Sequence, residues 1–372
     1  MKQALTTRAD TVGSLLRPQE LLETRERHAA GELSAAEFKR IEDRAVDWAI
    51  GLQERAGLPV VTDGEMRRES FQSQMVEATE GFGEHDIDAW LWGEWHGDEA
   101  VGDKTTERPQ TLGAVGKLRR RRHLSVEEFV YARGRTERII KVTLPSPSMY
   151  ANLWSPELST GAYPTLNLFL EDVAGILREE VEELVRLGAE YIQLDAPHYP
   201  LLLDPRTRAF YEQRGWDLDR WLGRGIELDN HVIGAHRDVT FSFHLCRGNQ
   251  GSRWLVSGFY ELLARRIFGG INAQRLMLEY DDERSGDFEP LAHVPEDKVA
   301  VLGLVTTKTS RRETPEELEA RIREASRFVP LKRLALSPQC GFATSIVGNA
   351  ISVEDEEYKL STIVETAERV WG

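Results

Sequence analysis

The chain has 372 residues, of which 41% are hydrophobic and 29% are charged, a composition typical of a globular protein of one or two domains. Its formal net charge of −15 argues against nucleic acids and anionic membrane surfaces as general partners. Residues 1–10 are too polar for a signal peptide, and no apolar stretch reaches the ~20 residues of a membrane-spanning helix. With two cysteines in all, the sequence predicts a cytoplasmic protein without a disulfide framework, and leaves homo-oligomer formation open.

Short apolar segments alternate with segments of helical periodicity along the chain, a pattern that predicts a parallel sheet. Helices are expected over 18–30, 34–57, 167–187, 204–237 and 353–370, with another that begins near 314. Ser34 with Glu37 forms a capping-box pattern, and Thr314 before Pro315 suits a helix start. The apolar segments cover residues 8–12, 58–61, 139–144, 191–194, 239–243, 275–278, 299–305 and 333–336. Eight such segments predict an α/β fold, a TIM (β/α)8 barrel that spans residues 1–372 as one domain.

An irregular segment, residues 81–135, interrupts the alternation after the second predicted strand. It is rich in Trp, Gly and acidic residues, with Trp-Leu-Trp-Gly-Glu-Trp-His-Gly-Asp at 90–98. An insertion of this length predicts a small inserted subdomain, which is either a lid over a binding site or a flap that packs on the barrel rim. The basic run 117–123 within it is either a solvated loop or a contact for an anionic substrate tail.

Metal-binding side chains stand at the ends of three predicted strands. His244 and Cys246 follow the fifth apolar segment, and their spacing of two directs both side chains to one face of a strand. Glu279 ends the sixth segment, and Cys340, the other cysteine of the chain, follows the eighth. Taken singly, a cysteine is more often a core residue than a ligand. One imidazole, one carboxylate and two thiolates at the same edge of a barrel nevertheless predict a Zn²⁺ site.

These segments resemble the catalytic barrel of the cobalamin-independent methionine synthase family. In that family a His-x-Cys strand end, a Glu at the next strand end and a Cys followed by Gly near the last strand bind zinc, and His244, Cys246, Glu279 and Cys340 match this set. Three further motifs resemble the family: Thr-Val-Gly-Ser at 11–14, Asp-Gly-Glu-Met-Arg at 63–67 and Gln-Leu-Asp-Ala-Pro at 193–197. The full-length enzyme of the family has an additional N-terminal barrel, so the chain resembles its shorter, single-barrel branch.

The resemblance also implies how substrates are bound. Glu65 and Asp195 would hold the amino group of an amino-acid thiol such as homocysteine, and Ser14 would contact its carboxylate. Trp154 stands where the family places a Trp near the pterin of a reduced folate, a cofactor-binding role for which core or rim packing is the alternative.

Two positions depart from the family pattern. Ala196 stands where the family has a Glu, so one acid near the amino-acid pocket is missing. Lys308 stands where the family has a His thought to protonate the departing folate nitrogen, and lysine at its usual pKa near ~10.4 is a poor acid at neutral pH. Asp195 and Lys308 are the candidate catalytic residues, and Lys308 could instead bind an anionic group of the substrate.

The favoured function is zinc-dependent transfer of an alkyl group to a thiol, with a small-molecule thiol and an alkyl donor as partners and without nucleic acid or membrane. Its most specific form is methyl transfer from methyl-tetrahydrofolate or another donor to homocysteine, which forms methionine. One alternative is transfer to coenzyme M, whose sulfonate Arg17, Arg67, Arg247 and Lys308 could bind. Another is a barrel with a structural, non-catalytic zinc ion. The donor, the thiol and the role of Lys308 do not follow from the sequence.

Overall fold

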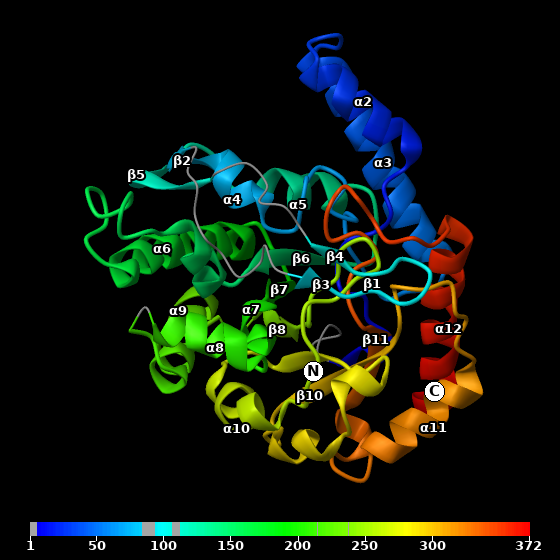
Figure 1. Ribbon diagram of the computed structural model, residues 1–372. Coiled ribbons are helices and arrows are strands. Elements are labelled where there is room, and N and C mark those ends of the chain that lie inside the picture. Colours follow the sequence, from blue (N-terminus) through cyan, green and yellow to red (C-terminus); the bar gives the residue numbers. More distant parts are fainter. Residues whose placement is uncertain (1–5, 84–93, 106–111, 214, 237) are drawn as a thin grey trace.

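The computed structural model describes residues 6–83, 94–105, 112–213, 215–236 and 238–372. Seven parallel strands form one curled sheet in the order β1-β6-β7-β8-β9-β10-β11, with helices outside it, which is consistent with a TIM-like barrel (Figure 1). Successive strands are neighbours in this order, so the sheet follows the chain. The strands are β1 (Val60–Val61), β6 (Ile139–Pro145), β7 (Tyr191–Asp195), β8 (Thr240–Leu245), β9 (Arg275–Glu279), β10 (Val299–Val305) and β11 (Leu334–Pro338).

The first predicted strand, 8–12, is present only as a single parallel bridge between Ala9 and Leu336 of β11. On its other side the Thr62 hydroxyl, just after β1, donates to the carbonyl of Gly13 at 2.6 Å. The segment therefore lies between β11 and β1, in the place of an eighth strand. The Asp10 carboxylate accepts the N–H of Thr11 at 2.9 Å, which uses a backbone donor that a longer strand would pair with its neighbour.

Most of the predicted helices are present, and the predicted capping box at Ser34 with Glu37 is confirmed. Thr314 is the predicted N-cap, and it forms a second capping box with Glu317. The segment 204–237, predicted as one helix, forms two helices on either side of Gly215, whose φ of 78° is unsuited to a helix. The α-helices are α2 (Gln19–Ala29), α3 (Ala35–Arg55), α4 (Ser73–Ala78), α5 (Val126–Arg133), α6 (Leu166–Arg186), α7 (His198–Leu201), α8 (Pro205–Glu212), α9 (Leu218–Ile233), α10 (Glu261–Gly270), α11 (Pro315–Ala325) and α12 (Val353–Trp371). Short 3-10 helices are η2 (Pro147–Leu153), η3 (Glu283–Ser285), η4 (Glu289–His293) and η5 (Leu331–Arg333). Among the helices described, none is long and apolar enough to cross a membrane.

Two small antiparallel ribbons lie between β1 and β6, where the sequence predicts an insertion. One pairs β2 (Thr79–Gly83) with β5 (Gly113–Arg120), and the other pairs β3 (Glu94–Trp95) with β4 (Lys104–Thr105). His96 exchanges two backbone hydrogen bonds of 2.8 and 2.9 Å with Trp254, so the β3–β4 ribbon is attached to the loop that follows β8. Residues 84–93, with two of the tryptophans, lie outside the described residues.

The basic run 117–123 makes ion pairs on the outside of the barrel. Lys117 lies 3.2 Å from Asp172, and Arg120 lies 2.9 Å from Glu179. The His123 ring contacts the buried carboxylate of Glu180 at 2.9 Å. These acids belong to α6, so the charges of the run that pair with them hold β5 and the following loop to this helix.

A fully buried charge cluster fills the barrel beneath the strand ends. The Asp10 carboxylate accepts from Lys141 at 2.9 Å, from Arg275 at 3.1 Å and from the Tyr191 hydroxyl at 2.7 Å. Burial alone would raise the pKa of Asp10, but Lys141 and Arg275 outweigh it and hold this pKa below its ordinary value. The Lys141 ammonium also donates to the side chain of Gln193 at 2.9 Å, which connects the cluster to the residues above it.

Candidate active site

A cavity of about 370 Å³ opens at the carboxyl ends of the strands. This is the edge at which TIM barrels place their chemistry. Of the residues that the sequence proposes for the site, those in the cavity wall are Ser14, Glu65, Asp195, His244, Cys246 and Cys340. Glu279, Lys308 and Trp154 do not line it.

His244, Cys246 and Cys340 meet in the cavity wall. A ring nitrogen of His244 and the two sulfur atoms all lie within 4.8 Å of one another, and all three residues are buried. The hydrogen bond with Cys340 lowers the pKa of the Cys246 thiol in spite of burial, while the same contact and burial raise the pKa of Cys340. One thiol of the pair therefore ionises first. An imidazole and two thiols at this separation are a donor set that fits zinc.

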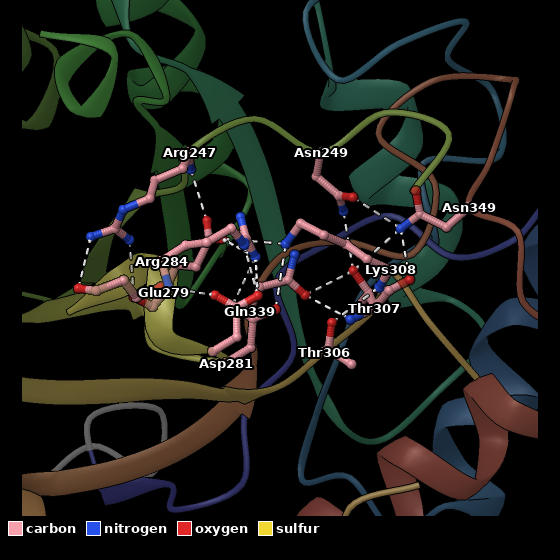
Figure 2. Close-up of polar contacts among 12 residues, drawn as sticks. Arg247, Asn249, Glu279, Asp281, Arg284, Thr306, Thr307, Lys308, Gln339 and Asn349 are labelled. Atoms are coloured by element: carbon pink, nitrogen blue, oxygen red, sulfur yellow. Dashed lines mark hydrogen bonds and ion pairs between the residues drawn. The ribbon is translucent and has the colours of Figure 1, made fainter. Parts of the chain in front are cut away.

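The fourth predicted ligand, Glu279, lies beside this cluster but is not one of the three groups that meet within 4.8 Å. Its carboxylate accepts the backbone N–H of Arg247 at 2.8 Å and lies 3.3 Å from the ammonium of Lys308 (Figure 2). Burial would raise the pKa of Glu279, but Lys308, Arg284 and Arg247 lower it to about 2. Glu279 is thus an ionised carboxylate, and its negative charge acts to raise the pKa of both cysteine thiols.

Lys308 is buried between two carboxylates instead of facing the cavity. Its ammonium lies 3.3 Å from Glu279 and 3.5 Å from Asp281, both in or next to the end of β9 (Figure 2). Burial would lower the pKa of Lys308, but these two acids raise it above its ordinary value. The lysine therefore carries a positive charge that is committed to protein carboxylates.

Asp195 connects the cavity to the buried charge cluster. Its Oδ1 accepts from the Nε2 of Gln193 at 2.8 Å and contacts the Nδ1 of His244 at 3.0 Å. The Gln193 amide has a fixed orientation, because its Oε1 accepts from the ammonium of Lys141 and its Nε2 donates to the Val12 carbonyl at 2.9 Å. Because these contacts make Asp195 an acceptor, His244 presents Nδ1–H to Asp195. Its Nε2 lies 3.3 Å from the carbonyl of Gln339 and is the ring nitrogen that a ligand would use in place of that contact.

Glu65 supplies a second carboxylate. It has a φ of 56°, uncommon for a residue other than glycine, and it follows Gly64 in the turn after β1. Its Oε1 accepts from the hydroxyl of Thr143 at 2.7 Å, whereas Oε2 is buried with no hydrogen-bond partner among the described residues. Burial raises the pKa of Glu65 against the opposing effect of Arg68. A buried carboxylate oxygen without a partner at a cavity suits a cationic ligand group.

Ser14 approaches the cysteine loop closely. A Cβ at position 341 would overlap the hydroxyl of Ser14, so any larger residue there would force this hydroxyl to move. The backbone N–H of Phe342 donates to the Ser14 carbonyl at 2.8 Å, which holds the two loops together. Trp154, in contrast, packs on the hydrophobic core and donates its indole N–H to the carbonyl of Tyr163 at 3.0 Å.

Other wall residues were not singled out from the sequence. Trp95 of the β3–β4 ribbon and Phe71 supply aromatic surface, and Glu69 adds an exposed carboxylate. The Trp-rich segment was a visible signal for Trp95, but nothing local distinguished Phe71 or Glu69. Gln193, the partner of Asp195, lay inside a recognised motif without an assigned role.

The fold and the cavity define a class of protein: an α/β protein with a curled parallel sheet, consistent with a TIM-like barrel, whose strand ends bring one histidine and two cysteines together at a cavity. Comparison with known families is more specific. The family described as cobalamin-independent synthase, catalytic domain, matches residues 5–368, and the chain belongs to this family.

Relatives match over nearly the whole chain. YxjH of Bacillus subtilis, an uncharacterized protein, is 34% identical, with 98% of this chain and 94% of that protein covered. A methionine synthase of Pyrococcus abyssi is 26% identical, with 89% and 84% covered. A structure from Listeria monocytogenes, of a candidate vitamin-B12 independent methionine synthase, has a TM-score of 0.74 at 26% identity and covers 100% of both chains. The structure of a B12-independent methionine synthase from Shewanella has the same TM-score at 22% identity, with 98% and 97% covered, and supports the fold.

Proposed function

We propose that the protein is a zinc-dependent methyltransferase that transfers a methyl group to the sulfur of homocysteine and so forms methionine. The observation that carries the proposal is the convergence of His244, Cys246 and Cys340 in the wall of a cavity that also holds the carboxylates of Glu65 and Asp195. Relatives named methionine synthase support the choice of reaction. The proposal treats residues 1–372 as one barrel domain, with 81–135 as an irregular insertion within it.

His244, Cys246 and Cys340 would hold the zinc ion, with Glu279 as the proposed fourth ligand. Zinc bound there would lower the pKa of a substrate thiol and supply a thiolate nucleophile at neutral pH. Glu279 lies outside the group that meets within 4.8 Å, so its carboxylate would have to approach the two cysteines to complete the set. Lys308 then has the role of keeping Glu279 ionised, and it is not itself a substrate contact in this proposal.

The amino group of homocysteine would lie between Glu65 and Asp195. The free Oε2 of Glu65 and the carboxylate of Asp195 give two acceptors in the same cavity wall. The carboxylate of homocysteine would contact the Ser14 hydroxyl. Together these contacts orient the thiol toward the three metal-binding side chains, since the acids and the ligands stand at neighbouring strand ends.

The direct test is methionine formation from homocysteine and a panel of methyl donors, with the product identified by mass. Cys246→Ser and Cys340→Ser are expected to lose both zinc, measured by elemental analysis, and activity, while thermal unfolding shows that the variants remain folded. Full zinc occupancy in both variants, or no methionine with any donor, would overturn the proposal. X-ray absorption at the zinc edge separates the non-catalytic alternative, because a closed structural site gains no sulfur contact when homocysteine is added.

Transfer to coenzyme M is less well supported than transfer to homocysteine. A sulfonate needs a cationic partner, and none of the four candidates, Arg17, Arg67, Arg247 and Lys308, lies in the cavity wall. Arg67 pairs with Asp43 at 2.6 Å.

A further inference from the structure

The walls of the cavity differ from what an anionic methyl donor requires. The described residues that line the cavity include no lysine and no arginine. They do include three acids, Glu65, Glu69 and Asp195. The glutamate tail of a folate carries negative charge, which proteins bind with arginine or lysine. Within the described lining a polyanion finds no such partner and is repelled by the acids.

The neighbouring cations are already occupied by the protein. Arg17 donates to the carbonyls of Glu65 at 3.0 Å and Arg68 at 3.1 Å. Arg247 donates to the carbonyl of Gly258 at 2.7 Å and lies over the ring of Tyr260. Arg253, on the loop after β8, donates to the Gly102 carbonyl at 2.8 Å. These guanidinium groups hold loops together around the cavity and are directed at backbone oxygens.

The cavity lining instead combines aromatic surface with negative charge. Trp95, Phe71 and the exposed carboxylate of Glu69 all line the cavity. The indole N–H of Trp95 is buried without a hydrogen-bond partner among the described residues. Aromatic faces and carboxylates are the groups that bind onium cations, through cation–π attraction and charge.

From this wall we infer that the methyl donor is a small methylsulfonium cation, bound between Trp95, Phe71 and Glu69. The inference rests on the proposed function, because it names the donor for the same site. Homocysteine occupies the inner end of the cavity, where Glu65 and Asp195 lie close to the cysteines. The sulfonium then lies on its outer side, with a methyl group toward the acceptor sulfur.

The chemistry of a sulfonium fits the remaining groups. The homocysteine thiolate forms a new S–CH₃ bond as the bond between that methyl carbon and the sulfonium sulfur breaks. The bonding electron pair stays on the leaving sulfur, which departs as a neutral thioether. The only proton released is the thiol proton of homocysteine. A departing amine nitrogen needs a proton, whereas a departing thioether needs none. Transfer from a sulfonium therefore requires no proton donor, which agrees with a Lys308 that is held by two carboxylates.

The test uses the zinc-loaded protein with trimethylsulfonium, S-methylmethionine or 5-methyl-tetrahydrofolate as donor and homocysteine as acceptor. Methionine and the neutral thioether should form from a sulfonium, and calorimetry should detect trimethylsulfonium binding without homocysteine. Trp95→Leu should weaken that binding about tenfold. Glu69→Gln should weaken it up to about fivefold, because this carboxylate is exposed. Trp371→Leu, the same change at a tryptophan far along the chain in α12, should leave binding unchanged.

The outcomes separate the donor from the reaction. Methionine from methyl-tetrahydrofolate but from neither sulfonium would overturn the inference and leave the proposed function standing. Trimethylsulfonium binding that depends on Trp95, without methionine from any donor, would support the cation site and overturn the proposed function. Absence of both binding and turnover with the sulfonium compounds would overturn the inference.

Discussion

Asp195→Asn is the most informative single substitution, because Asp195 faces both the candidate metal ligand and the cavity. In the protein its Oδ1 accepts from Gln193 at 2.8 Å and contacts His244 at 3.0 Å. Lys141 fixes the orientation of the Gln193 amide, so its Nε2 stays a donor in the variant. The asparagine must therefore direct its oxygen toward Gln193 and His244, and its NH₂ takes the place of Asp195 Oδ2.

Two measurable losses follow from that geometry. The hydrogen bond to His244 survives without its charge, and loss of such a carboxylate partner weakens zinc binding about 10–100-fold, or about 1.4–2.7 kcal/mol. The amide NH₂ in place of Oδ2 repels an ammonium group, so the KM for homocysteine should rise more than kcat falls. Zinc affinity is measured by competition with a chromophoric chelator, and KM by methionine formation at saturating donor.

A matched control is available in Asp229→Asn. Asp229 is also fully buried and accepts two hydrogen bonds of 2.7 Å, from the hydroxyls of Ser146 and Tyr199, but it does not line the cavity. This variant should keep the zinc affinity of the unmodified protein. Zinc binding by Asp195→Asn within twofold of the unmodified protein would refute the role assigned to Asp195.

Three further outcomes are expected. Gly341→Ala should destabilise the protein by about 1–3 kcal/mol in urea unfolding, because the new Cβ overlaps Ser14 Oγ. The same overlap should raise the KM for homocysteine, and an unchanged KM would contradict the close packing. Glu356→Gln should reduce the pH dependence of the free energy of unfolding. Burial raises the pKa of Glu356 from 4.5 to about 8, so its contribution is fully present below pH 4.5 and is lost as the pH rises through about 8, and an equally steep decline in the variant would contradict this. Lys141→Met should cost about 3–5 kcal/mol in urea unfolding because it removes a buried counter-charge of Asp10, and the double variant with Asp10→Asn should be less destabilised than the sum of the two single changes.

The sequence by itself determined the strand order and the strand ends at which His244, Cys246 and Cys340 lie. Each of the seven strands is a local apolar segment, and sheet order follows chain order, so periodicity was sufficient to predict them. His244, Cys246 and Cys340 were predictable because side chains that follow parallel strands meet at one edge of the sheet. The first predicted strand is only a bridge, and there the Asp10 carboxylate accepts the backbone N–H of Thr11. The pattern of apolar residues carries no information about such a side-chain hydrogen bond.

Only the tertiary structure decided which charges face the cavity. Lys308 is an isolated lysine in the sequence, and the fold places its ammonium between Glu279 and Asp281, residues about thirty positions earlier in the chain. Trp95 reaches the cavity because its ribbon attaches to the loop after β8. Such contacts join side chains that are distant along the chain, and no local pattern encodes their direction. The grouping of His244, Cys246 and Cys340 could therefore be predicted from their positions, whereas the charge of the cavity wall depends on the folded arrangement.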